Sequence, residues 1–220
     1  MSGPAEPTGV TQWVENPEGG RPRGPRGLAR AWVEVLVRPG RFFGNGVAPA
    51  DQAPGLTFAL AVAFTFVGGR LLLSPGSLPG YTRVVSSTGS PYLSAAVLAG
   101  VIGFLIAPLV LHLAAALATL SLMAVVDDRA GISETVQVVA YASAPAVFVA
   151  VPHPAVQVAA TSYSALLVAV GFAVVHETSP PRAAVAAVLP AVFVFGFAFG
   201  GIGAVEAVTG LEVTGDRTAG

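Results

Sequence analysis

Residues 93–126 read LSAAVLAGVIGFLIAPLVLHLAAALATLSLMAVV, a run of 34 residues without an acidic or basic side chain other than one histidine. A transmembrane helix needs about 20 apolar residues to cross a hydrocarbon core of about 30 Å. A helix of this whole run would be about 51 Å long, which is too long for one upright span and too short for two spans with a turn. We therefore predict one long membrane helix, bent at Pro108.

Four more stretches of the chain are long and apolar enough to cross a membrane. They are residues 56–73, 135–151, 155–175 and 183–205. Only 10% of the chain is charged and 54% is hydrophobic, whereas soluble domains carry about 25% charged residues. A soluble fold would have too few polar groups to cover its surface. The sequence predicts an all-α, polytopic transmembrane bundle of about five spans.

The regions outside the spans differ sharply from them in composition. Residues 1–27 are polar and rich in proline, glycine and arginine, which is typical of a disordered tail. We predict a membrane domain over 28–206 and a short polar tail over 207–220. The linker at 74–92 is full of turn residues.

Residues 28–37, LARAWVEVLV, have the spacing of an amphipathic helix. Ten residues reach only about 15 Å, so this helix cannot span the bilayer. We predict that it lies in the membrane interface, with Trp32 at headgroup level; the alternative is a cytoplasmic helix packed on the rest of the protein. The candidate membrane-interface residues are Trp32, Arg38, Arg41, Phe42 and Phe43.

The distribution of arginine predicts the orientation, because cytoplasmic loops carry an excess of basic residues. Six arginines precede the first span: Arg21, Arg23, Arg26, Arg30, Arg38 and Arg41. With that segment inside, five spans place Arg129 and Arg182 inside as well, and leave Arg70, Arg83 and Arg217 outside. We predict a multi-pass protein of the cell membrane with a cytoplasmic amino terminus and a carboxyl terminus on the outer face.

The chain lacks the residues of common catalytic motifs. It has no lysine and no cysteine, which excludes a GxxxxGK[ST] phosphate loop, a Schiff-base lysine, disulfides and thiolate metal sites. His176-Glu177 is not followed by the second histidine of HExxH, and no GxSxG motif occurs. We predict no catalytic residue, no metal, no cofactor and no enzyme activity, and interpret His176, Glu177 and Arg182 as a solvated loop. A net charge of −1 gives no reason to expect nucleic acid as a partner.

Two intramembrane polar residues are candidates for function, His112 and Tyr141. An ionisable group inside a span suggests a functional site, so His112 is a candidate proton relay or metal ligand. The alternative is a neutral imidazole that forms a hydrogen bond between helices. Tyr141, with Gln137 and Ser143, has the chemistry to form hydrogen bonds across helices.

Small residues recur in the last predicted span. Gly196, Gly200 and Gly203 follow helical spacing in FGFAFGGIG. Small residues let helix backbones approach closely in membranes, so we predict a helix-packing surface, either within the bundle or between two copies.

Two motifs resemble the Yip family, the membrane proteins named for interacting with Ypt/Rab GTPases, in its prokaryotic, possibly archaeal, branch. One is the Arg-Pro-x-x-Phe-Phe segment at 38–43, and the other is GISETVQVVAYASAP at 131–145. The five-span pattern with the amino tail inside is similar too, and the resemblance covers about 28–206. It implies a helical membrane bundle and, in eukaryotes, a role in vesicle traffic through small GTPases. The tail here is short and arginine-rich, so we do not expect a eukaryotic-type small GTPase as a partner.

These observations favour a non-enzymatic membrane protein. The first hypothesis is a scaffold, a membrane-organising protein or a partner-binding protein, whose partners are the lipid bilayer and other membrane proteins or a second copy. The alternative is a transporter or channel subunit with a site near His112.

Overall fold

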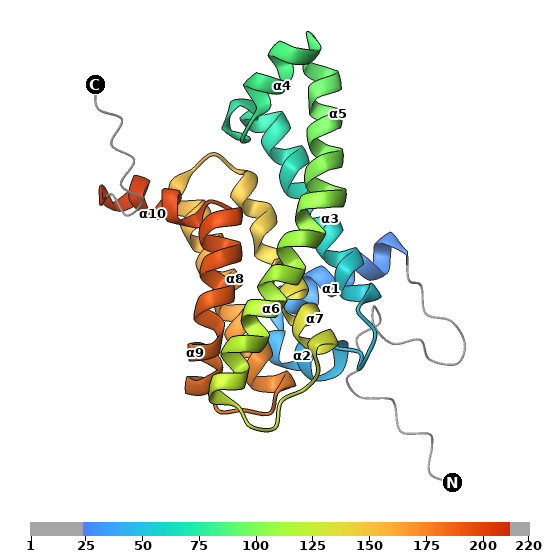
Figure 1. Cartoon of the computed structure of the whole chain (residues 1–220), viewed down its shortest axis with the longest axis vertical. Helices are drawn as coiled ribbons and strands as arrows, with labels where there is room; N and C mark the ends of the chain where they lie inside the picture. Colours follow the sequence, from blue (N-terminus) through green and yellow to red (C-terminus); the bar gives the residue numbers. More distant parts are fainter. Residues whose placement is uncertain (1–23, 212–220) are drawn as a thin grey trace.

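The computed structural model describes residues 24–211, and all regular secondary structure within them is helical (Figure 1). Our predictions for residues 1–23 and 212–220 lie outside this part of the chain. The elements are α1 (Pro25–Val37), α2 (Pro39–Gly46), α3 (Ala53–Leu73), η1 (Pro75–Ser77), α4 (Tyr81–Thr88), α5 (Pro91–Val101), η2 (Ile102–Ile106), α6 (Ala107–Val125), α7 (Ile132–Ala142), η3 (Ala144–Ala150), α8 (Pro154–Val175), α9 (Pro180–Ala191), η4 (Val192–Ala198) and α10 (Gly201–Thr209).

Within the described residues, five helices are long and apolar enough to cross a membrane, as the sequence predicted. They are Ala53–Leu73, Pro91–Val125, Ile132–Ala150, Pro154–Val175 and Pro180–Ala198. Figure 1 shows them side by side, with the α6–α7 and α8–α9 connections at the lower end of the bundle and α4 at the upper end. We use "lower end" and "upper end" in this sense below.

The second span is a single helix of 35 residues. Its backbone widens to a π turn over η2, where the Ala107 N–H bonds to the Ile102 carbonyl. Pro108 follows at once and has no N–H to donate. The π turn is therefore the local adjustment that lets one helix pass a proline.

The last span differs from its prediction. Pro190 lies inside this helix, which continues as the π-helical η4 and ends at Ala198. Gly200 then takes a positive φ of 77°, a conformation that favours glycine. The chain turns there and begins α10, so 183–205 is not one continuous helix.

Two other predicted boundaries need correction. α1 begins at Pro25, inside the stretch we predicted as a disordered tail, because proline is well suited to the first turn of a helix. The linker 74–92 contains a helix of its own, α4, which Gly80 and Gly89 bound with positive φ angles. Turn residues in this linker therefore mark the ends of a short helix.

α7 and η3 form the centre of the bundle. This span is the most buried of the five, because 72% of an apolar stretch of 18 residues within it lies inside the protein. α3, α6 and α8 all pack on α7, and α1 packs on α7 and η3. The N-terminal helix α1 thus covers a part of the central span that the other four spans do not cover.

Candidate functional site

α1 and α2 together form what we call the N-terminal platform, Pro25–Gly46. It carries four arginines, Arg26, Arg30, Arg38 and Arg41, and one acidic residue, Glu34. All four arginines are exposed. Ala31 and Val35 on the opposite face of α1 are fully buried against the bundle. α1 is therefore amphipathic, as predicted, with its apolar face on the protein.

Two long-range hydrogen bonds attach α1 to the bundle. The Trp32 indole Nε1–H donates to the Ala144 carbonyl at 2.8 Å, and the Tyr163 hydroxyl donates to the Leu36 carbonyl. The Trp32 ring also lies 5.7 Å from the Phe148 ring. The polar groups of Trp32 and Tyr163 thus form hydrogen bonds within the protein, and these two bonds fix the position of α1 on the spans.

Phe42 and Phe43 point into the bundle, whereas we predicted that they face the membrane interface. Their exposed fractions are 1% and 2%, because α2 turns both rings into the bundle. The Tyr141 ring contacts Phe42 from one side at 4.8 Å and Phe58 from the other at 5.1 Å, both edge-on. Tyr141, an intramembrane candidate, therefore belongs to an aromatic cluster that joins the platform to two spans.

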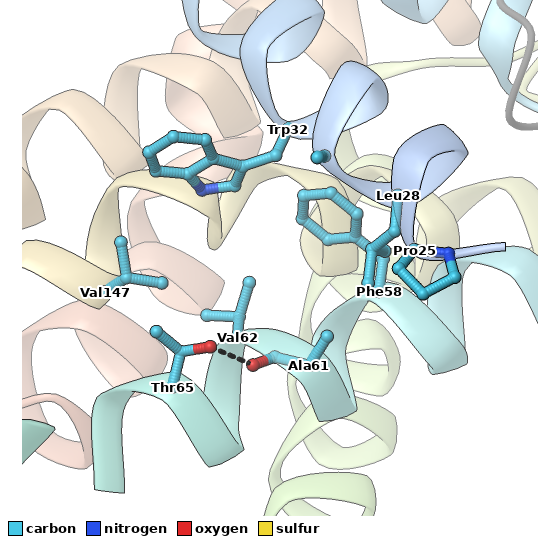
Figure 2. Close-up of a pocket in the computed structure, with 9 residues that line it drawn as sticks. Pro25, Leu28, Trp32, Phe58, Ala61, Val62, Thr65 and Val147 are labelled. Atoms are coloured by element: carbon cyan, nitrogen blue, oxygen red, sulfur yellow. Dashed lines mark hydrogen bonds between the residues drawn. The ribbon is translucent and has the colours of Figure 1, made fainter. Parts of the chain in front are cut away.

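An apolar groove lies between α1, α3 and η3 (Figure 2). It holds about 320 Å³ and is lined by Pro25, Leu28, Ala29, Trp32, Phe58, Ala61, Val62, Thr65 and Val147. The Thr65 hydroxyl donates to the Ala61 carbonyl at 2.7 Å, and the Trp32 N–H is bonded to Ala144. The hydrogen-bond donors of Thr65 and Trp32 beside the groove are thus already hydrogen-bonded to backbone carbonyls. The groove is therefore suited to a hydrocarbon ligand.

The Gln137 side chain holds the α2–α3 connection, and it is completely buried. Its amide oxygen accepts from the Ala48 N–H at 3.0 Å, and its amide nitrogen donates to the Ala48 carbonyl at 2.7 Å. Gly55 on α3 lies so close that an added Cβ would be 2.9 Å from the Gln137 side chain. We expected Gln137 to bond across helices, and it instead satisfies both backbone groups of one loop residue.

His176 is a polar side chain that we misread. We interpreted 176–182 as a solvated loop, and Glu177 and Arg182 are indeed exposed, but His176 is only 1% exposed. Its Nδ1 accepts from the Ala130 N–H at 3.1 Å, and its Nε2 lies 3.4 Å from the Thr135 hydroxyl. The Ala130 bond requires an unprotonated Nδ1. His176 thereby joins the two connections at the lower end of the bundle.

Burial lowers the pKa of His176 to about 4. The main cause is desolvation, which disfavours the charged imidazolium. Glu134 opposes this shift through its negative charge, and Arg129 adds to it. The residue is therefore neutral at pH 7, which matches its role as an acceptor from Ala130.

His112 lies on the exposed side of α6. Its Nδ1 is 2.7 Å from the Pro108 carbonyl in the preceding turn of the same helix. A cavity of about 50 Å³ borders the neighbouring residues Val110 and Leu111, and His112 is not among its lining residues. The imidazole therefore turns outward and bonds within its own helix.

The three glycines of the last span do not share one helical face. Gly196 lies in η4, where an added Cβ would be 3.2 Å from Ile202 of α10. Gly200 forms the turn, and Gly203 lies on α10. Neither Gly200 nor Gly203 has an atom within 4 Å of an added Cβ. Gly196 therefore packs against α10, and the other two glycines lie beyond the end of the span.

Residues 24–211 contain no group of three His, Asp or Glu side chains placed to hold a metal ion. A family model described as the Yip1 domain matches residues 33–202, more than half of the chain. The chain belongs to the Yip1 family. The Yip1 match begins within α1, confirms the resemblance drawn from 38–43 and 131–145, and agrees with a multi-pass membrane protein. Comparison with curated proteins and with solved structures gave no match.

Proposed function

We propose that this Yip1 protein is a non-enzymatic, membrane-organising protein whose N-terminal platform binds anionic lipid. The observation that supports this function is the charge of the platform, with four exposed arginines and a single glutamate. Juxtamembrane basic residues attract anionic lipid by about 1 kcal/mol each near the surface. Arginine is also well suited to bind phosphate oxygens through two parallel hydrogen bonds.

The rigid attachment of the platform supports the same function. Trp32 and Leu36 are bonded to the spans, and Phe42 and Phe43 are buried in the core. The arginines are therefore carried by helices that hold a fixed position on the bundle. Lipid binding at such a surface needs little further ordering of the protein.

The transport alternative stays a prediction, and we favour the organising function for one reason. A transport site at His112 needs a polar cavity within the bundle, and the His112 ring turns outward. A scaffold for other membrane proteins or for a second copy is compatible with lipid binding, and we propose no specific protein partner.

The lipid experiment uses the full-length protein in mild detergent. We expect added phosphatidylglycerol to raise the melting temperature more than added phosphatidylcholine does, and added salt to reduce the difference. The variant with Arg26, Arg30, Arg38 and Arg41 changed to Gln should lose this preference. Arg83→Gln is the matched control, because Arg83 is exposed on α4 at the upper end. Equal stabilisation by both lipids, or an equal loss in the control, would refute lipid binding by the platform.

We also propose that the lower end of the bundle faces the cytoplasm. The platform arginines precede the first span, and Arg129 and Arg182 lie at the α6–α7 and α8–α9 connections. With five spans these six arginines belong to the same side of the membrane, and an excess of arginine is typical of the cytoplasmic side. Reporter fusions test the orientation: a fusion at residue 1 should report from inside the cell and a fusion at residue 220 from outside. Two reports from the same face would contradict it.

A further inference from the structure

α1 lies far above the lower end of the bundle. Its two hydrogen-bond partners, Ala144 and Tyr163, each stand twelve residues from the lower ends of their spans, Ile132 and Val175. At 1.5 Å per residue this height is about 18 Å. Figure 1 likewise shows α1 beside the middle of the bundle, with α2 below it.

This height conflicts with a flat bilayer around the protein. Spans of 19 to 22 residues match the hydrocarbon thickness of about 30 Å, so a helix 18 Å above their lower ends would lie near the membrane centre. The outer face of α1 carries the exposed Arg26 and Arg30. Charged side chains at that depth are costly unless the surroundings are polar.

The apolar surface on the α1 side is displaced upward. α3, which borders the groove with α1, is an apolar helix of 21 residues, and Figure 1 shows the hairpin of α3 and α5 rising above the upper ends of the other spans. This hairpin exposes apolar side chains toward its upper end: Leu72, Leu73, Leu93 and Val97. Lipid on this side therefore meets an apolar surface that begins higher than it does elsewhere.

The bundle has a full apolar height elsewhere on its surface. α6 and α9 pack against each other, and they expose Met123 by 57% and Val185 by 62% near the lower end. The apolar surface there begins at the bottom of the spans and runs for about 28 Å along α6. The apolar surface therefore begins at different heights on the two sides of the protein.

We infer that the lower surface of the bilayer is raised beside α1, so that lipid headgroups reach Arg26 and Arg30 at mid-height of the bundle. The platform charge is complementary to phosphate, and α1 also exposes Val33 and Val37, which suits a helix at the boundary between headgroups and acyl chains. A mismatch between the apolar surface of a protein and a flat bilayer is met by tilting or by local deformation of the bilayer, at a modest cost per ångström. This inference rests on the proposed lipid-binding function and adds its geometry.

The absence of cysteine allows single spin labels to test the raised headgroup level in the full-length, reconstituted protein. Val33→Cys and Val37→Cys place labels on α1. Leu113→Cys is the matched control, because Leu113 is exposed by 47% and also stands twelve residues from the lower end of its span. Collisions with a water-soluble nickel complex and with oxygen, which concentrates in hydrocarbon, report the depth of each label.

We expect nickel collisions to dominate at both α1 labels and oxygen collisions to dominate at Leu113→Cys, in vesicles with and without phosphatidylglycerol. Oxygen dominance at the α1 labels would place α1 in hydrocarbon and overturn the inference. Labels on α1 that neither reagent reaches would show that a second copy or another protein covers the platform, and would overturn it too. A depth difference that persists without any preference for phosphatidylglycerol would support the raised headgroup level while refuting the proposed anionic-lipid binding.

Discussion

His176 gives a direct prediction about the pH dependence of stability. Its pKa is about 4 in the folded protein and about 6.5 in an unfolded chain. Between these two values the unfolded state binds a proton that the folded state does not, so stability decreases as the pH falls from 6.5 toward 4 and is unaffected by this group above pH 7. At about 1.36 kcal/mol per pKa unit, the full loss is about 3 kcal/mol, and about 2 kcal/mol of it is present at pH 5.

The melting temperature of the purified protein in detergent measures this effect. For a chain of this size, a loss of about 2 kcal/mol lowers the melting temperature by roughly 4–8 °C between pH 7 and pH 5. In His176→Asn the amide oxygen replaces Nδ1 as acceptor from Ala130 and does not titrate, so this part of the pH dependence should disappear.

His153→Gln is the control, because His153 is exposed on the connection between η3 and α8. It should retain the pH dependence of the unmodified protein. If His176→Asn keeps the same slope between pH 5 and pH 6.5, the buried, neutral state assigned to His176 is wrong.

Three further substitutions, one of them with a matched control, test the contacts that hold the platform and the spans together, each by thermal unfolding in detergent. Gln137→Leu leaves the N–H and carbonyl of Ala48 without their side-chain partner and should cost about 1–3 kcal/mol. Trp32→Phe keeps most of the ring but removes the bond to η3, with an expected loss of about 1 kcal/mol; an unchanged melting temperature would show that this bond does not hold α1. Gly171→Ala sets a Cβ 2.5 Å from Val138 and should cost about 1–3 kcal/mol, whereas Gly68→Ala, with open space around it, should be neutral or slightly stabilising.

The number and approximate places of the spans could be predicted because lipid imposes one dominant constraint. Backbone polar groups in hydrocarbon must be bonded within a helix, so a long apolar run has one stable conformation. The exact ends were harder to predict. Gly200 was predicted to belong to a helix-packing surface with Gly196 and Gly203, and only its backbone angle of φ 77° reveals that the helix has already ended there.

The functional residues were less predictable because their partners are distant in sequence. His176 appears beside Glu177 in a polar stretch, which is typical of a solvated loop, yet its acceptor bond comes from Ala130, 46 residues earlier. Phe42 and Phe43, next to Arg41, were predicted to face the membrane interface, and both are buried in the bundle instead, where Phe42 contacts Tyr141. In each case the composition describes the local sequence correctly, but it does not predict which distant part of the chain packs on these side chains.

The platform and the central span depend on each other. α7 carries Gln137 and Tyr141, polar groups that lipid would solvate poorly, and both face elements next to or within the platform: Ala48 and Phe42. A sixth full span would cover them equally well but would bring hydrocarbon against this side of the bundle. Two short helices cover the same groups and leave arginines outside them. The polar residues of α7 therefore explain why a platform is needed there, and its arginines explain why the lipid beside it is expected to differ from the lipid around the other spans.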